Sequence, residues 1–171
     1  MTIPIKASEF EFEIGLPNYD IMTCAWRGAC IELFARVERE IVDCLETLGR
    51  TGYSIDGKAR HEAPKIRLRA LKTILEQSSF DGHSKPALKK LDEWLDLLDA
   101  RDWIVHGSFA MKSTEVRVDH FKYKKQVRTD TPTLNVNLAE MMGLLARFDK
   151  GQRELHQALG QIKASASRSK P

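Results

Sequence analysis

The sequence lacks the residue patterns that mark most metalloproteins. It has only three cysteines, Cys24, Cys30 and Cys44, and they form no CxxC pair. Its five histidines are scattered, without HxxxH or HExxH spacing. We therefore expect no metal site and no bound cofactor. Small buried thiols in a reducing compartment are the interpretation that the cysteine spacing favours.

Motifs for nucleotide binding and for serine hydrolysis are missing as well. The sequence has no GxGxxG motif after a predicted strand and no GxSxG elbow. Residues 52–58 match the glycine and lysine spacing of a phosphate-binding loop. The next residue, Ala59, lacks the hydroxyl that would bind magnesium, and a predicted helix precedes the loop where a strand is required. We interpret this match as chance.

Long apolar runs and a strong excess of one charge are also absent. No apolar run approaches the length of a membrane-spanning helix. Lys6, Glu9 and Glu11 interrupt the first twelve residues, which argues against a signal peptide. The net charge of +3 permits polyanion binding without requiring it. We expect a soluble, cytoplasmic protein that does not associate with membranes.

The apolar periodicity predicts an all-α fold, an antiparallel bundle of four to five helices with a small β-hairpin inserted before the last helix. Helices are expected over about residues 20–48, from Pro64, from Ser84 to Ala100, and from a capping box at Asn137 and Glu140. Alternating residues predict the hairpin at about 108–128. The expected division is an N-terminal arm over 1–19, the bundle over 20–163, and a flexible basic tail over 164–171.

Basic residues gather in two regions that suit RNA. In the predicted hairpin they interleave with aromatic residues, so that cations can meet phosphates and rings can stack on bases. In the second predicted helix they share one face. The candidate RNA-binding residues are Arg117, Lys122, Lys124, Lys125, Lys65 and Arg69. An ordinary solvated surface is the alternative interpretation of both regions.

Residues 101–107, Arg-Asp-Trp-Ile-Val-His-Gly, are the stretch best suited to phosphate chemistry. Arg101 offers a planar fork of donors, and His106 can transfer a proton near neutral pH. On a straight helix the two are separated by about 140° of rotation, so they would not share a face. They converge if the helix unwinds near Gly107, or if two copies meet across a dimer. Alternatively, both merely cap the carboxyl end of their helix.

Glu38 borders the apolar face of the first predicted helix, one turn from Phe34. A solvated acid is the ordinary interpretation of such a position. The second interpretation is an acid that orients a cationic group.

The stretch Arg101-Asp-x-x-x-His106-Gly, at the end of an apolar helix, resembles the Arg-x4-6-His motif of HEPN domains. That family favours Asn, Asp or His after the arginine, and Asp102 fits. The order of elements agrees over about residues 20–163: a long first helix, an antiparallel pair, the motif, a hairpin insert and a final helix. The N-terminal arm and the loop after the first helix have no counterpart.

The resemblance implies a homodimer with two motifs in one cleft. Many HEPN proteins are metal-independent endoribonucleases of toxin–antitoxin or defence systems. By this resemblance, His106 would exchange protons with the attacking 2′-hydroxyl or the leaving 5′-oxygen, Arg101 would bind the scissile phosphate, and Asp102 would orient one of them or hold the local turn. The implied partners are RNA and a nucleotidyltransferase-like antitoxin. The alternatives are a non-catalytic HEPN-like module that binds RNA or a protein, and a plain helical interaction protein.

Overall fold

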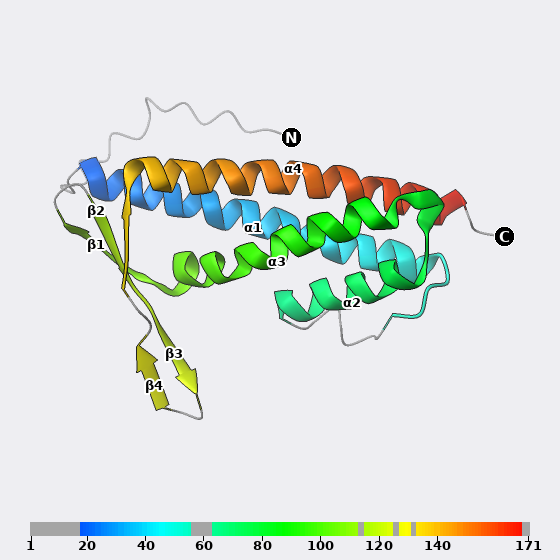
Figure 1. Ribbon diagram of the computed structural model, residues 1–171, viewed down its shortest axis with the longest axis horizontal. Coiled ribbons are helices and arrows are strands. Elements are labelled where there is room, and N and C mark those ends of the chain that lie inside the picture. The colour runs from blue at the N-terminus through cyan, green and yellow to red at the C-terminus, as the bar shows by residue number, and fades with distance from the viewer. Residues whose placement is uncertain (1–17, 56–62, 113–114, 125–126, 131–132, 169–171) are drawn as a thin grey trace, which may run out of the picture.

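The computed structural model describes residues 18–55, 63–112, 115–124, 127–130 and 133–168. Over these residues the protein is mostly helical, with a small antiparallel sheet before the last helix (Figure 1). The predicted N-terminal arm lies outside the described residues up to position 17, and Asn18 already belongs to the first helix. None of the described helices carries an apolar stretch long enough to cross a bilayer.

The described residues form four α-helices, each of which begins close to its predicted start, and the third continues past its predicted end at Ala100 to His106. They are α1 (Asn18–Arg50), α2 (Pro64–Gln77), α3 (Ser84–His106) and α4 (Leu138–Arg168), with a short 3-10 helix, η3 (Phe80–Gly82), between α2 and α3. The predicted flexible tail is wrong over residues 164–168, because α4 continues to Arg168. Ser165 is buried there and its hydroxyl donates to the Asp81 carboxylate at 2.5 Å, so tertiary contacts hold the last turn.

The three long helices lie side by side along the molecule (Figure 1). Helices α1 and α4 run in the same direction, because the Trp26 indole donates to the Met141 carbonyl at 2.6 Å while Lys163 reaches Asp43 farther along both helices. Helix α3 runs the opposite way between the same ends. Helix α2 packs on α3 and α1 in the half of the molecule away from the sheet.

An aromatic cluster joins the three long helices at the centre of the core. Phe34 of α1 lies 5.5 Å from Trp94 of α3 and 4.7 Å from Phe148 of α4, measured between ring centroids. All three pairs meet edge to face, the geometry that aromatic quadrupoles favour. The cluster fixes the spacing of the helices, and with it the side chains that α1 and α3 present to each other.

The β insertion is larger than the single predicted hairpin. Strands β1 (Ser108–Lys112), β2 (Glu115–Asp119) and β5 (Leu134–Asn137) form an antiparallel sheet in the order β1-β2-β5. Strands β3 (Phe121–Lys124) and β4 (Val127–Asp130) form a second hairpin that projects away from the helices (Figure 1). Val116 and Val118 bury the inner face of β2, which the alternation predicted. Strand β5 has only four residues and was not predicted, since too few positions alternate.

The predicted capping box at the start of α4 is confirmed. The backbone N–H of Asn137 donates to the Glu140 carboxylate at 2.8 Å, and the Glu140 N–H donates to the Asn137 side-chain oxygen at 3.0 Å. These bonds satisfy donors that the first helical turn leaves free. Because Asn137 also ends β5, the sheet joins α4 without a linker.

The three thiols are expected to differ sharply in reactivity. Burial raises the pKa of the Cys30 and Cys44 thiols to about 12, whereas Cys24 is exposed. Since the thiolate is the reactive form, a thiol-specific disulfide reagent at pH 8 should modify one thiol in the folded protein and three in denaturant. The Cys24→Ser variant should show no rapid reaction until it unfolds. Rapid modification of Cys30 or Cys44 in the folded protein would contradict this assignment.

Candidate functional site

Helix α3 remains regular through the motif. The Gly107 N–H donates to the Trp103 carbonyl at 2.8 Å, which closes the last turn after His106. The helix therefore does not unwind near Gly107, and Arg101 and His106 point about 140° apart around its axis. The Arg101 side chain is 23% exposed, whereas His106 lies on the surface. Within one chain the two motif residues are not brought together.

Arg101 is held between two carboxylates. Its Nη2 lies 3.6 Å from Glu38 Oε1 of α1, and its Nη1 lies 3.3 Å from Asp102 Oδ1 of its own helix. Its Nε is buried and has no hydrogen-bond partner among the described residues. An unsatisfied buried donor costs about 1–3 kcal/mol, so its presence needs a reason. Arg101 is thus oriented by acids while part of its hydrogen-bonding capacity is unused.

Arg67, a residue that sequence reasoning missed, contacts the same acid. Its Nη2 donates to Glu38 Oε2 at 3.2 Å, so Glu38 bridges guanidinium groups of α2 and α3. The basic stripe of α2 that includes Lys65 and Arg69 faces outward, and Arg67 is not part of it. The available signal was its place beside Leu68 and one turn before Leu71, on the flank of the buried face.

Asp102 lies between the two motif residues. It contacts Arg101, and it stands one helical turn before His106, on the same side of α3. No hydrogen bond or ion pair of the His106 side chain occurs within the part of the chain that the structure describes. The imidazole is exposed at the surface of the described part of the structure.

Arg27 of α1 binds the carboxyl end of α3. Its Nη2 donates to the Val105 carbonyl at 2.6 Å, and its guanidinium lies over the Phe109 ring, 4.9 Å from the centroid. A cation at a helix carboxyl end is favoured by the helix dipole, and the ring adds a cation–π contact. Capping of the carboxyl end of α3 was the alternative role for Arg101 and His106. At the Val105 carbonyl, Arg27 performs this role.

The candidate RNA-binding residues occupy different settings. Lys65 and Arg69 are exposed on the outward face of α2. Arg117 lies 2.9 Å from Asp119, and hydrogen bonds from Thr133 and Arg117 lower the pKa of that carboxyl, so the Arg117 charge is compensated locally. Lys122 and Lys124 belong to β3, and their side chains lie outside the described part of the structure. Lys125 lies outside the described residues.

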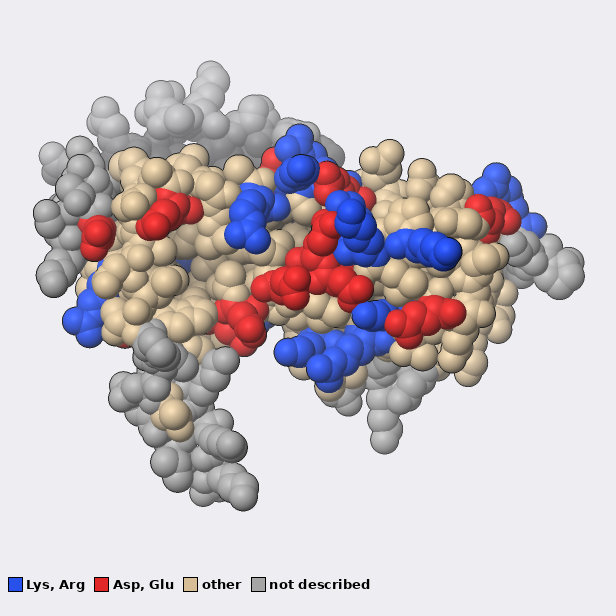
Figure 2. Space-filling model, viewed as in Figure 1, with Lys and Arg blue, Asp and Glu red and all other residues tan. Residues whose placement is uncertain are grey.

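Arg101 and His106 lie in different electrostatic surroundings. Figure 2 shows acidic side chains in a band across the middle of the face formed by α3, with basic side chains gathered over the start of α2. The exposed acids of α3 are Asp92, Glu93, Asp96 and Asp99. Helical geometry places His106 on the side of this band, whereas Arg101 faces Glu38 of α1. A phosphate chain is therefore repelled from the outer face of α3 and attracted beside α2.

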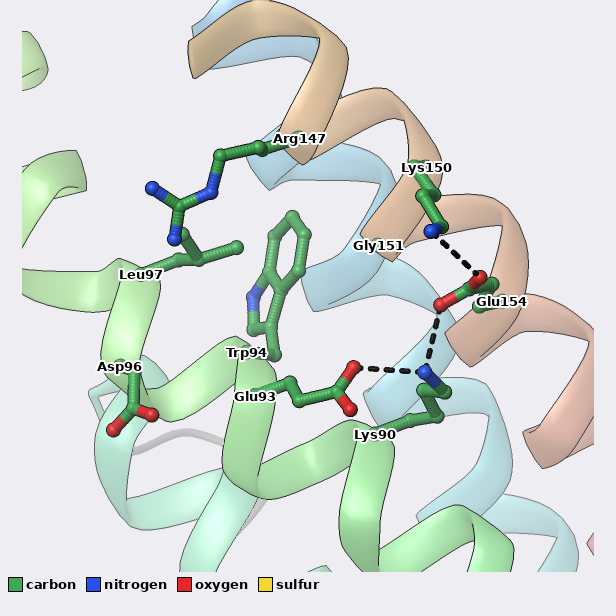
Figure 3. A pocket seen from close by; sticks show the side chains of 9 residues that line it. All are labelled: Lys90, Glu93, Trp94, Asp96, Leu97, Arg147, Lys150, Gly151 and Glu154. Carbon is green, nitrogen blue, oxygen red and sulfur yellow. Dashed lines mark hydrogen bonds and ion pairs between the residues drawn. The ribbon is translucent and has the colours of Figure 1, made fainter. Parts of the chain in front are cut away.

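A cavity of about 350 Å³ between α3 and α4 lies apart from the motif (Figure 3). Four of its charged side chains pair with each other: Lys90 bridges Glu93 at 2.8 Å and Glu154 at 2.7 Å, and Lys150 lies 3.9 Å from Glu154. The hydrogen bonds that the Lys90 ammonium donates to Glu154 and Glu93 raise the pKa of Lys90. Elsewhere in the described ranges, no three His, Cys, Asp or Glu side chains group so that they could hold a metal ion.

Gly107, at the end of the motif, has neighbours so close that a Cβ atom has no room. A Cβ at Gly107 would lie 2.3 Å from the Trp103 carbonyl oxygen and 2.6 Å from Val118 Cγ1. We expect Gly107→Ala to destabilise the fold by about 1–3 kcal/mol in denaturant unfolding, because α3 and β2 must separate. The control is Gly143→Ala in α4, where a Cβ meets nothing within 4 Å and the change should stabilise by up to about 1 kcal/mol. Equal effects of the two substitutions would contradict the close approach.

No family model matches the chain, and neither a curated protein nor a solved structure matches it. The resemblance to HEPN domains accordingly rests on the motif, the helix that carries it and the order of the elements.

Proposed function

We propose that the protein is an HEPN-type endoribonuclease that acts as a homodimer and needs no metal ion. The observation that carries the proposal is the state of Arg101. This arginine is part-buried at the end of an apolar helix, is oriented by Glu38 and keeps an unused donor, while His106 five residues later is exposed. In this proposal the four helices form a bundle of the HEPN kind.

The proposed reaction is attack by a ribose 2′-hydroxyl on the adjacent phosphate. The 2′-oxygen forms a bond to phosphorus, the bond to the 5′-oxygen breaks, and the products are a 2′,3′-cyclic phosphate and a 5′-hydroxyl. His106 takes the proton from the 2′-hydroxyl or gives one to the leaving 5′-oxygen. Arg101 binds the phosphate and stabilises the charge that develops on it. Because the ribose supplies the nucleophile, no metal-bound water is required.

The geometry of α3 supports the proposal of a dimer. Arg101 and His106 of one chain face different sides of a regular helix, and the acids near His106 repel phosphate from its surface. Two copies related by a two-fold axis can place Arg101 of one beside His106 of the other. Glu38 then holds the guanidinium, and Asp102 orients Arg101 or the turn that presents His106. Lys65 and Arg69, on the outward face of α2, extend the path of the strand.

A second candidate is a non-catalytic HEPN-like module that binds RNA or a protein, such as a nucleotidyltransferase-like antitoxin. The observation that favours it is the charge balance of Arg101, which already meets Glu38 and Asp102 within its own chain. This candidate predicts binding without cleavage.

Replacing either motif residue should abolish cleavage and leave the fold intact. We expect His106→Ala and Arg101→Ala each to slow the cleavage of a labelled RNA by about 10²-fold or more, the usual contribution of general acid–base or electrostatic catalysis. The control is His156→Ala, because His156 is an exposed histidine that pairs with Glu40 of α1. EDTA should not change the rate. Cleavage that persists in both motif variants, or that EDTA abolishes, would contradict the proposal.

Mixing the two inactive variants tests the shared site directly. A dimer of Arg101→Ala with His106→Ala keeps one intact combination of arginine and histidine across the interface. Random exchange of subunits should therefore restore about a quarter of the wild-type rate. Cleavage should be measured after a cycle of dissociation and reassociation, with each variant alone as the control. If the mixture stays inactive although mixed dimers form, the two residues do not act across the interface.

A further inference from the structure

Two guanidinium groups share the carboxylate of Glu38. Oε1 faces Arg101 Nη2 at 3.6 Å, and Oε2 accepts a hydrogen bond from Arg67 Nη2 at 3.2 Å. Because each arginine uses a different oxygen, neither forms the two-point fork that saturates a guanidinium. An arginine has five N–H donors, so Arg67 keeps most of its donors for another group.

Arg67 is the less neutralised of the two arginines. Arg101 also contacts Asp102, whereas Glu38 is the ion-pair partner of Arg67 among the described residues. The side chains of Arg67 and Glu38 are only 18% and 28% exposed, so solvent screens their charges less than those of a surface pair. The first turn of α2 contains no acid, and no side chain caps it. The start of α2 thus adds the partial positive charge of a helix amino end beside Arg67, and this favours an anion.

We propose that Arg67 is a second phosphate-binding residue, and that Arg101 and Arg67 hold two successive phosphates of one RNA strand on either side of Glu38. This inference rests on the proposed function for the identity of the strand. The two guanidinium groups meet different oxygens of one carboxylate, so a single phosphate cannot bind both while Glu38 remains between them. Arg101 binds the scissile phosphate and Arg67 binds its neighbour. Cleavage then favours a strand that continues past the scissile bond by at least one phosphate.

The salt dependence of binding measures the contact without cleavage. We would use a fluorescent 2′-O-methyl RNA hexamer, which lacks the attacking hydroxyl, and follow its anisotropy at several salt concentrations. Arg67→Gln should weaken binding about tenfold at low salt. It should also lower the slope of log K against log salt by about 0.7, the value for one phosphate contact on a single strand.

The control tests whether the effect is specific to Arg67 or follows from the loss of any arginine. Arg36→Gln removes an α1 arginine that also pairs with a glutamate, Glu32 at 2.9 Å, but that is 54% exposed. It should change neither the affinity nor the slope. The Glu38→Gln variant tests the alternative role, in which Arg67 only holds the Glu38 side chain in place. In that role Glu38→Gln and Arg67→Gln act alike, whereas the proposal predicts that Glu38→Gln keeps the slope at or above the wild-type value.

Substrate length supplies the kinetic test. With a cleavable hexamer, Arg67→Gln should raise KM several-fold, and with a dinucleoside monophosphate, which has no second phosphate, it should change little. Circular dichroism confirms that each variant is folded. An unchanged slope in Arg67→Gln, with cleavage by the wild type, overturns the second phosphate contact and leaves the proposed function standing. A reduced slope without any cleavage by the wild type supports the contact and overturns the proposed nuclease. No binding by the wild type overturns both.

Discussion

One carboxylate, that of Glu38, joins α1 to both α2 and α3 through polar contacts. Glu38 stands on α1 and meets an arginine from each of the other two helices, where the side chains are only partly exposed. Removing the acid would leave two guanidinium groups close together with less compensation than they have now, and a part-buried charge without its partner is costly. The aromatic cluster of Phe34, Trp94 and Phe148 sets the distance between α1 and α3. Packing thus decides where the acid stands, and the acid decides where both arginines point.

The surface charge differs between the two sides of this arrangement. Acids cover the outward side of α3, and basic residues lie around the start of α2 (Figure 2). A polyanion is attracted to the start of α2, where Arg67 lies, and is repelled from the acidic side of α3, to which His106 belongs. The modest net charge of +3 therefore hides a local asymmetry, because acids gather over Asp92–Asp99 of α3 and basic residues gather around the start of α2.

Much of the helical fold could be predicted from the sequence, and less of the site. The apolar periodicity of α1 and α4 and the Asn137–Glu140 box are local signals, so they were sufficient. The end of α4 was missed because Ser165 is held by Asp81, a residue distant in sequence. The strand pairing of β2 with β5 was missed for the same reason. Arg101 and His106 were recognised as a motif, but Arg67 depends on the way α2 packs against α1, which no pattern within α2 encodes.

The second hairpin, β3–β4, has a consequence for how such a protein can diversify. It lies between β2 and β5, and these two strands pair directly, with Val118 opposite Leu134 and the Thr133 hydroxyl bonded to Asp119 at 2.8 Å. These contacts thus hold the two ends of the β3–β4 insertion together. Insertions, deletions or exchanges within it need not move the end of α3 or the start of α4. The sequence of the hairpin can therefore vary while the Arg101–His106 segment keeps its geometry.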